Sequence, residues 1–271
     1  MSTHLGRRSA ASANTAIPAP RDAVPAVLRA AQVLDALAAV REPQALAELT
    51  RRLNLPKSSV LGLCNTLAST GLVTRHADGR FGLGVHLVDL AHAYLAGVNL
   101  TQEFNNACES MQDLPKEGIV LAVLDGTDSV YVACRNGEMP LGVAYRIGMR
   151  LPANCTATGK ALLSSLPEAR VRELFRHTRL SRLTPHSHRS LKSLLADLAE
   201  IRVRGYAIDD QETREGMMCI GAPVLGSAGS QAVAAVAVST LKYPDEREKF
   251  RLATSAIRDF AGRLSKRLGA I

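Results

Sequence analysis

Basic side chains gather in one short part of this 271-residue chain, and their type and spacing suit them to hold phosphate groups. Between residues 51 and 80, five basic side chains stand against one acid, Asp78, so this stretch carries net +4 within a chain of net +8. The five are Arg51, Arg52, Lys57, Arg75 and Arg80. Such a cluster can neutralise nucleic-acid phosphates. Charge alone fits a solvated basic surface on an ordinary helical domain equally well. The secondary structure that carries these residues is therefore needed to distinguish the two interpretations.

The apolar spacing around these residues predicts two short helices joined by a tight turn. Leu46, Leu49 and Leu53 recur at helical spacing, and the pattern resumes at Val60 after an interruption at residues 54–56. Proline is tolerated in the first turn of a helix, because the N–H that it lacks would have no intrahelical partner there. Pro56 therefore predicts where the second helix begins.

A β-hairpin is predicted directly after the second helix. Gly71 closes that helix, Val73 begins a strand, and turn-forming residues 77–79 lead into a second strand from Arg80 to Leu83. A preceding helix over residues 24–40 is expected to pack behind the pair through one apolar face. That face comprises Val27, Leu28, Ala31, Leu34 and Leu37. This order is typical of a winged helix-turn-helix, which predicts double-stranded DNA as the partner.

The candidate DNA-binding residues lie on the second helix, at its entrance and on the wing. They are Arg51, Lys57, Ser58, Ser59, Asn65, Arg75 and Arg80. Hydroxyls and helix N-terminal N–H groups suit phosphates, and asparagine can make a bidentate contact to adenine. Ordinary helix capping is an equal alternative for Ser58 and Ser59, and a solvated polar position is the favoured alternative for Asn65.

Side chains capable of catalysis or metal binding form no site that the sequence supports. Cys219 is a candidate nucleophile, but none of the seven histidines falls in the segments around it, and no Gly-x-Ser-x-Gly occurs. His186 and His188 flank one serine, yet they lie in a Ser/Thr/Pro-rich segment with no nearby acid or cysteine, which favours a solvated loop. The sequence therefore predicts no enzyme, no metal site and no cofactor.

The first 23 residues and the cysteines bear on where the protein works. Residues 1–23 are small, polar and proline-containing, without the apolar run of a signal peptide or membrane span, and Arg7-Arg8 has no hydrophobic region after it. The five cysteines are scattered and form no C-x-x-C pair, which argues against a disulfide framework or a zinc ribbon. A disordered tail, reduced thiols, a cytoplasmic location and no membrane partner are expected.

The rest of the chain alternates helices with short strands. Helices are expected at residues 85–98, 101–113, 156–165, 167–177 and 190–204, with one more closing the chain. Strands are expected at residues 118–124, 129–134, 141–146, 206–209, 217–224 and 232–240. Mostly antiparallel strands flanked by helices describe an α+β domain. The closing helix, with apolar residues every fourth position, either caps the sheet or meets a partner chain.

Four segments in this order resemble the IclR-type bacterial transcriptional regulators. They are LAELTRRLNLPKSSV, the wing DGRFGLG, ATGKALLSSLP, and GYAIDDQETREGMMCIGAPVL followed by AVAAVAVS. The resemblance implies an N-terminal winged helix-turn-helix joined by a helical linker to a GAF-like antiparallel α+β domain that binds a small organic acid. It also implies homodimers or tetramers on the DNA. The expected divisions are a tail (1–23), the DNA-binding domain (24–84), the linker (85–113) and the effector-binding domain (114–271).

One departure from the family concerns the DNA reader. Where the family commonly has a histidine and an arginine after PKSTV, this chain has Leu61 and Gly62. An arginine there would contact phosphate or guanine, whereas a glycine inside a helix costs about 1 kcal/mol. Operator choice is therefore expected to depend on the other candidate residues.

The resemblance also implies an effector pocket, formed by Ala157, Thr158, Asp209, Cys219 and Ser239. Ala157 and Thr158 match positions whose backbone N–H groups hold the ligand carboxylate, which a helix N-terminus favours. Ser239 can donate a hydrogen bond, whereas an ionised Asp209 accepts only, so the ligand is expected to carry a hydroxyl or amide donor unless Asp209 is protonated. The alternatives are a buried apolar role for Cys219 and a strand-end turn for Asp209. Lys160 is expected to be a surface or structural residue.

These observations predict a ligand-responsive, DNA-binding regulator of a catabolic operon, a repressor by family type, although the sequence does not distinguish repression from activation. A two-fold dimer predicts an inverted-repeat operator. The alternative is a small-molecule sensor without specific DNA binding, which Gly62 makes conceivable.

Overall fold

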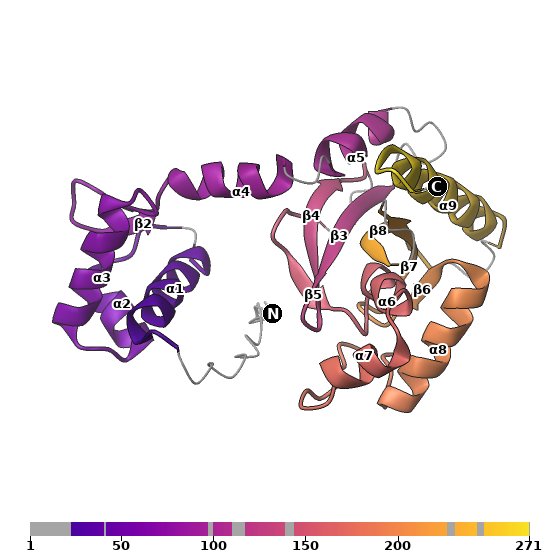
Figure 1. Ribbon diagram of the computed structural model, residues 1–271, viewed down its shortest axis with the longest axis horizontal. Helices are drawn as coiled ribbons and strands as arrows, with labels where there is room; N and C mark the ends of the chain where they lie inside the picture. The colour runs from indigo at the N-terminus through magenta and orange to yellow at the C-terminus, as the bar shows by residue number, and fades with distance from the viewer. Residues whose placement is uncertain are drawn as a thin grey trace, which may run out of the picture. The chain divides into compact units, whose positions relative to one another are not determined.

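The computed structural model describes residues 23–40, 42–96, 100–109, 117–138, 144–226, 231–242 and 247–270. The chain divides into two compact units, one ending at Tyr94 and the other beginning at Leu95 (Figure 1). The expected tail therefore lies outside the described residues except for Ala23, as do residues 97–99 and 110–113 of the expected linker. In the part of the chain described, no helix is long and apolar enough to cross a membrane.

The first unit is built from three helices and a two-stranded hairpin, followed by the start of a further helix. In chain order they are α1 (Pro25–Ala38), α2 (Leu46–Leu53), α3 (Lys57–Ser69), β1 (Val73–Arg75), β2 (Phe81–Leu83) and α4 (His86–Ala96). Their core contains Val33, Leu37, Leu49, Val60, Cys64, Leu67, Val73 and Phe81. Backbone hydrogen bonds between Gln44 and Phe81 attach the segment before α2 to the hairpin.

The predicted boundaries of α3 are confirmed by its backbone geometry. Asn54 ends α2 in the left-handed conformation, at φ 52°, and α3 begins directly after Pro56. Gly71, at φ +74°, follows the last turn of α3 and reverses the chain into β1. Both turns thus depend on the residues that marked them in the sequence.

The predicted buried face of α1 is partly wrong. Val27 is 65% exposed and Leu28 41% exposed, whereas the buried residues are Val33, Ala36 and Leu37. The helix packs against its neighbours through its C-terminal half, so its first two turns bury little apolar surface. Helical periodicity identified the element but not the length of it that contacts the core.

The second unit contains a six-stranded antiparallel sheet in the order β5-β4-β3-β8-β7-β6. Its strands are β3 (Gly118–Asp125), β4 (Asp128–Arg135), β5 (Arg150–Pro152), β6 (Ala207–Asp210), β7 (Met217–Leu225) and β8 (Ala232–Leu241). Its helices are α5 (Leu100–Glu109), α6 (Ala157–Ser164), α7 (Glu168–Leu174), α8 (Leu191–Arg204) and α9 (Arg247–Arg267). The α+β class and the antiparallel sheet are confirmed.

Helices cover both faces of this sheet, and alternation along the strands sorts the side chains (Figure 1). One face, which includes Ile119, Val236 and Ile220, packs on α5 and α9 around Phe104 and Phe260. The other face packs on α6, with α8 behind it. The closing helix thus caps the sheet, the first of the two possibilities that its spacing left open.

The expected strand at 141–146 is not found where the structure describes that segment. Residues 141–143 lie outside the described residues, and residues 144–146 are not in a strand. β5 (Arg150–Pro152) pairs with β4 instead. Of the described residues in this run, Tyr145 is buried in the cluster on the α6 face of the sheet, whereas Ala144 and Arg146 are exposed.

Candidate functional site

The N-terminus of α3 presents backbone donors and three of the candidate DNA-binding side chains. Lys57 and Ser58 are exposed and Ser59 is half-buried. The position before the helix is Pro56, which makes no side-chain cap, so the capping role considered for Ser58 and Ser59 is not found. The first N–H groups of a helix have no intrahelical partner, so this end is suited to a phosphate.

The other candidate DNA-binding residues are exposed at the turn before α3, farther along α3 and on the wing. Arg51 lies in the last turn of α2, and Asn65 lies on the exposed side of α3. On the wing, the Arg75 guanidinium lies 5.7 Å from the centre of the Phe81 ring, and Arg80 Nε lies 3.4 Å from Asp78 Oδ2. All four side chains remain accessible to a partner.

Two other residues of this region, Arg52 and Gly62, differ in their contacts. Arg52 donates a hydrogen bond from Nη1 to the Ala36 carbonyl at 2.8 Å, so this member of the basic cluster ties α2 to α1. A Cβ added at Gly62 would meet no atom within 4 Å, and the residue is exposed in the middle of α3. Packing therefore does not require a glycine there.

Asp209, Cys219 and Ser239 form a row across three adjacent strands on the α6 face of the sheet. Asp209 pairs with Cys219 between β6 and β7, and Cys219 pairs with Ser239 between β7 and β8. The Cys219 sulfur and the Ser239 hydroxyl lie 3.2 Å apart. The predicted pairing of Asp209 with Cys219 is confirmed, and Ser239 joins the row across the sheet.

Tyr145 completes this row and was missed by sequence reasoning. Its hydroxyl donates to Ser239 Oγ at 2.5 Å, and its ring meets Tyr131 edge-on with centroids 5.7 Å apart. A Cβ at Gly118 would lie 2.9 Å from the Tyr145 ring, so glycine makes room for it. Burial raises the pKa of the Tyr145 phenol, which therefore stays protonated as a donor. No motif singled out this tyrosine, because its contact with Ser239 spans 94 residues.

The N-terminus of α6 lies against this face of the sheet. A Cβ at Gly221 would lie 2.7 Å from the Ala157 backbone, so this glycine lets the helix approach β7 closely. The Thr156 hydroxyl caps the helix by accepting from the Gly159 N–H at 3.0 Å. Ala157 and Thr158 are both buried, and helix geometry gives their N–H groups no intrahelical acceptor. Two backbone donors with the positive end of a helix dipole suit an anion.

Asp209 is held by the loop that follows β6. Its Oδ1 accepts hydrogen bonds from the Glu212 N–H at 2.7 Å and the Thr213 N–H at 3.1 Å, and its Oδ2 lies 2.6 Å from the Thr213 hydroxyl. Burial raises the pKa of the Asp209 carboxyl, and these hydrogen bonds oppose that rise. These contacts fit the alternative interpretation of Asp209, as a turn residue at the end of a strand. Asp209 therefore fixes the loop beside the row.

Comparisons with known proteins identify the family. The profile of the bacterial transcriptional regulator IclR C-terminal domain matches residues 92–266, and that of the IclR helix-turn-helix domain matches residues 26–77. The chain belongs to the IclR family of transcriptional regulators. The family resemblance and the DNA-binding and effector domains that it implied are thereby confirmed.

Relatives of this IclR-family regulator cover most of its length. The probable transcriptional regulator SauR of Cupriavidus necator is 33% identical over 79% of this chain and 84% of its own. The regulator XynR of Escherichia coli is 29% identical over 80% of this chain and 86% of its own. The Agobacterium tumefaciens repressor BlcR is 39% identical, with a TM-score of 0.60, over 92% of this chain and 99% of its own. An IclR homologue from Microbacterium hydrocarbonoxydans complexed with 4-hydroxybenzoate shares the fold, at 22% identity and a TM-score of 0.77, over 90% of this chain and 98% of its own.

Beside the effector-domain row, this IclR-family chain holds a buried cluster of charges. Lys160 on α6 is 1% exposed, and its Nζ donates to Asp197 Oδ2 on α8 at 2.8 Å and to Glu212 Oε1. Lys160 is thus structural and not a surface residue. Arg204 also contacts Asp197, with 3.1 Å between Nη2 and Oδ1.

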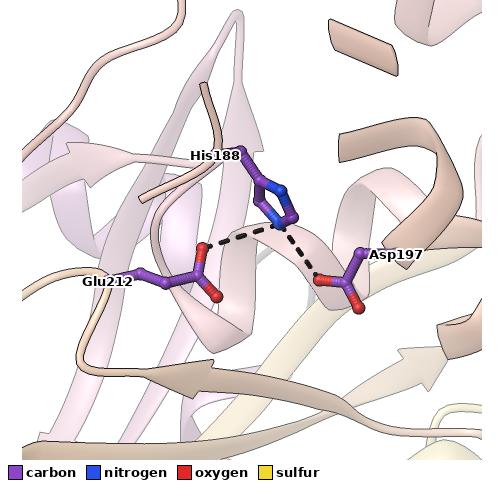
Figure 2. A group of neighbouring side chains, drawn as sticks. All are labelled: His188, Asp197 and Glu212. Carbon is purple, nitrogen blue, oxygen red and sulfur yellow. Dashed lines mark hydrogen bonds and ion pairs between the residues drawn. The ribbon is translucent and has the colours of Figure 1, made fainter. Parts of the chain in front are cut away.

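His188 joins this cluster, which corrects the solvated-loop interpretation. Its side chain is 17% exposed, and its Nε2 lies 3.3 Å from Asp197 Oδ2 and 3.7 Å from Glu212 Oε2 (Figure 2). His186, in contrast, is exposed. No acid lies near His188 in the sequence, so this expectation is wrong for the folded protein. The two acids that surround His188 come from α8 and from the loop after β6.

Opposite pKa shifts distinguish the two acids of the cluster. Burial raises the pKa of Glu212 to about 7, although Lys160 and His188 oppose the rise. Burial would also raise the pKa of Asp197, but hydrogen bonds from His188 and Lys160, with the charge of Arg204, bring it well below its usual range. The hydrogen bonds and charges around Asp197 thus outweigh its burial, whereas those around Glu212 do not.

Proposed function

We propose that this regulator represses a catabolic operon as a homodimer or tetramer, binds an inverted-repeat site in cytoplasmic DNA, and senses a small organic acid. The observation that carries the proposal is the approach of the α6 N-terminus to the strands that bear Cys219 and Ser239, within a chain that also has a winged helix-turn-helix. One unit supplies the DNA reader and the other the sensor.

The DNA-binding half of the proposal is supported by the exposed groups around α3. Lys57 and the free N–H groups at the start of α3 suit phosphates, as do Arg51 before it and Arg75 and Arg80 on the wing. Asn65 is exposed farther along α3, where it can contact a base edge. One such unit reads only a short half-site, so specificity requires pairing of two copies and an inverted-repeat operator. Repression is supported by BlcR, a repressor 39% identical to this chain.

The sensing half is supported by the donors on the α6 face of the sheet. The N–H groups of Ala157 and Thr158 and the hydroxyls of Ser239 and Tyr145 are suited to a carboxylate. Cys219 and the Tyr131 ring supply apolar surface beside them. The solved Microbacterium relative holds 4-hydroxybenzoate, which is a small organic acid. Since Asp209 already accepts three hydrogen bonds from its own loop, the anion is expected to be bound by the donors.

Two measurements test the proposal separately. A thermal-shift screen of small carboxylic acids tests the sensor, because a specific ligand stabilises the fold by mass action, by about 2.7 kcal/mol at 100 times its Kd. Selection of bound sequences from a random DNA pool tests the reader. An inverted repeat is expected, and footprints on an asymmetric site would contradict the paired arrangement.

The second candidate function is a small-molecule sensor that binds DNA without sequence preference. The observation in its favour is Gly62, an exposed glycine on the reading helix where the family commonly has an arginine. Salt titration separates the two functions. Both lose affinity as salt rises, but only the specific regulator keeps a preference for one site.

A further inference from the structure

We propose that His188, Asp197 and Glu212 form a binding site for a divalent transition-metal ion of the zinc type. One ligand atom from each residue lies within 4.8 Å of the other two (Figure 2). Imidazole nitrogen with two carboxylate oxygens is a donor set that zinc accepts in proteins. The proposal stands independently of the proposed regulatory function.

Two of the three donor-atom separations are close to the edge of a zinc coordination tetrahedron. Zinc binds histidine nitrogen and carboxylate oxygen at about 2.0–2.2 Å, which places neighbouring ligand atoms about 3.3–3.5 Å apart. His188 Nε2 lies 3.3 Å from Asp197 Oδ2 and 3.7 Å from Glu212 Oε2. Figure 2 shows both carboxylates directed at the same ring nitrogen. All three ligand atoms lie within 4.8 Å of one another, so the side chains need to move closer together to share one ion.

An unpartnered oxygen points into the proposed site. Glu212 is 7% exposed, and its Oε2 is buried without a hydrogen-bond partner, whereas its Oε1 is bound by Lys160. A buried carboxylate oxygen without a donor is costly, because its lost hydration is not replaced. A metal ion beside His188 Nε2 supplies the missing partner.

The backbone around the proposed site is held in place from both sides. The Ser187 hydroxyl donates to the Glu212 carbonyl at 2.8 Å, and the Thr184 hydroxyl donates to the Gln211 carbonyl at 2.7 Å. His188 Nδ1 lies 3.3 Å from the Ser193 hydroxyl, which orients the ring so that Nε2 faces the acids. Metal-binding histidines commonly have such a partner on the second ring nitrogen.

The charges of the cluster set the expected affinity. Lys160 and Arg204 already balance Asp197 and Glu212, so an added dication meets two positive neighbours. This repulsion favours a site of moderate affinity over a permanently filled structural site. Magnesium, which keeps a nearly ideal octahedron of oxygen ligands, is expected to bind poorly.

The test uses cobalt and zinc as probes on the full chain, with variants of single ligands. Cobalt absorption in the visible region reports a tetrahedral site, and a thiolate charge-transfer band in the near ultraviolet reports binding by any of the five cysteines instead. One cobalt per chain without the thiolate band, displaced by zinc and not by magnesium, is expected. His188→Gln and Glu212→Gln should weaken binding more than about 100-fold, beyond the 10–100-fold effect of an outer-shell partner.

His186→Ala is the matched control, because His186 is exposed and two residues from His188. It should leave cobalt binding unchanged. Equal binding by the wild-type protein and His188→Gln, or no binding by the wild type, overturns the proposal and leaves the cluster as a closed ion-pair network. If the variants fail to fold, zinc anomalous scattering from wild-type crystals shows where the ion binds. A peak between the three side chains is expected, and a peak only elsewhere overturns the site.

Discussion

Lys160→Met is expected to destabilise the second unit strongly in the presence of a chelator that removes metal ions. Lys160 is 1% exposed and binds two carboxylates. Without it Asp197 keeps Arg204 and His188, whereas Glu212 Oε1 loses its Lys160 partner and Oε2, which has no hydrogen bond, keeps only the 3.7 Å contact with His188. The variant therefore leaves one buried carboxylate uncompensated.

The size of the effect follows from this loss of a partner. Breaking a buried ion pair from one side costs about 3–5 kcal/mol, and about 2–4 °C of Tm are lost per kcal/mol in a domain of this size. A fall of about 6–20 °C is expected by calorimetry. Lys192→Met, an exposed lysine on α8, is the matched control and should change Tm by about 2 °C or less.

A double variant separates the charge effect from lost packing. Lys160→Met combined with Glu212→Gln removes the uncompensated carboxylate and should recover part of the lost Tm, because a neutral amide is cheaper to bury than a charge. If Lys160→Met lowers Tm no more than Lys192→Met, or if the double variant is simply additive, the cluster does not stabilise the fold as described.

Three further predictions concern the two proposed functions. Lys57→Ala and Arg80→Ala should each weaken specific and non-specific DNA binding alike and lower the salt slope by about 0.9, measured by anisotropy; an unchanged slope removes that residue from the interface. Gly62→Ala should raise the unfolding free energy by about 0.5–1 kcal/mol in urea titrations, because its Cβ meets open space on α3, and a loss of stability would contradict that geometry. Asp209→Asn should weaken a plain carboxylic acid and its hydroxylated analogue equally by calorimetry, because Asp209 fixes the loop after β6; selective loss of the hydroxylated acid would instead show direct contact.

Local signals in the sequence were sufficient for the ends of α3 in the first unit and for one strand pairing in the second. Pro56 and Gly71 marked the ends of α3, because each acts on the backbone at its own position. The pairing of Asp209 with Cys219 followed from a short connection between adjacent strands. Family segments supplied the fold class.

The chemistry of the α6 side of the sheet depends on contacts that local patterns do not encode. Lys160 meets Asp197 and Glu212 across 37 and 52 residues, and Tyr145 meets Ser239 across 94. No helical or strand period links such positions, so Lys160 remained ambiguous and Tyr145 was missed. His188 was misjudged for the same reason, since its acidic neighbours lie on α8 and in the loop after β6.

Reciprocal coupling between acid and operator, measured on wild-type protein and Ser239→Ala, tests the central claim most directly. Anisotropy with operator DNA, with and without the acid that a thermal-shift screen identifies, should reveal a coupling of about 1–3 kcal/mol, or 5–150-fold in affinity. Ser239→Ala should weaken the acid and leave DNA affinity without acid unchanged, because Ser239 lies in the second unit. Thr240→Ala, one residue along β8, is the control and should retain the coupling. Unchanged acid affinity in Ser239→Ala, or an acid that binds without altering DNA affinity, would contradict the account.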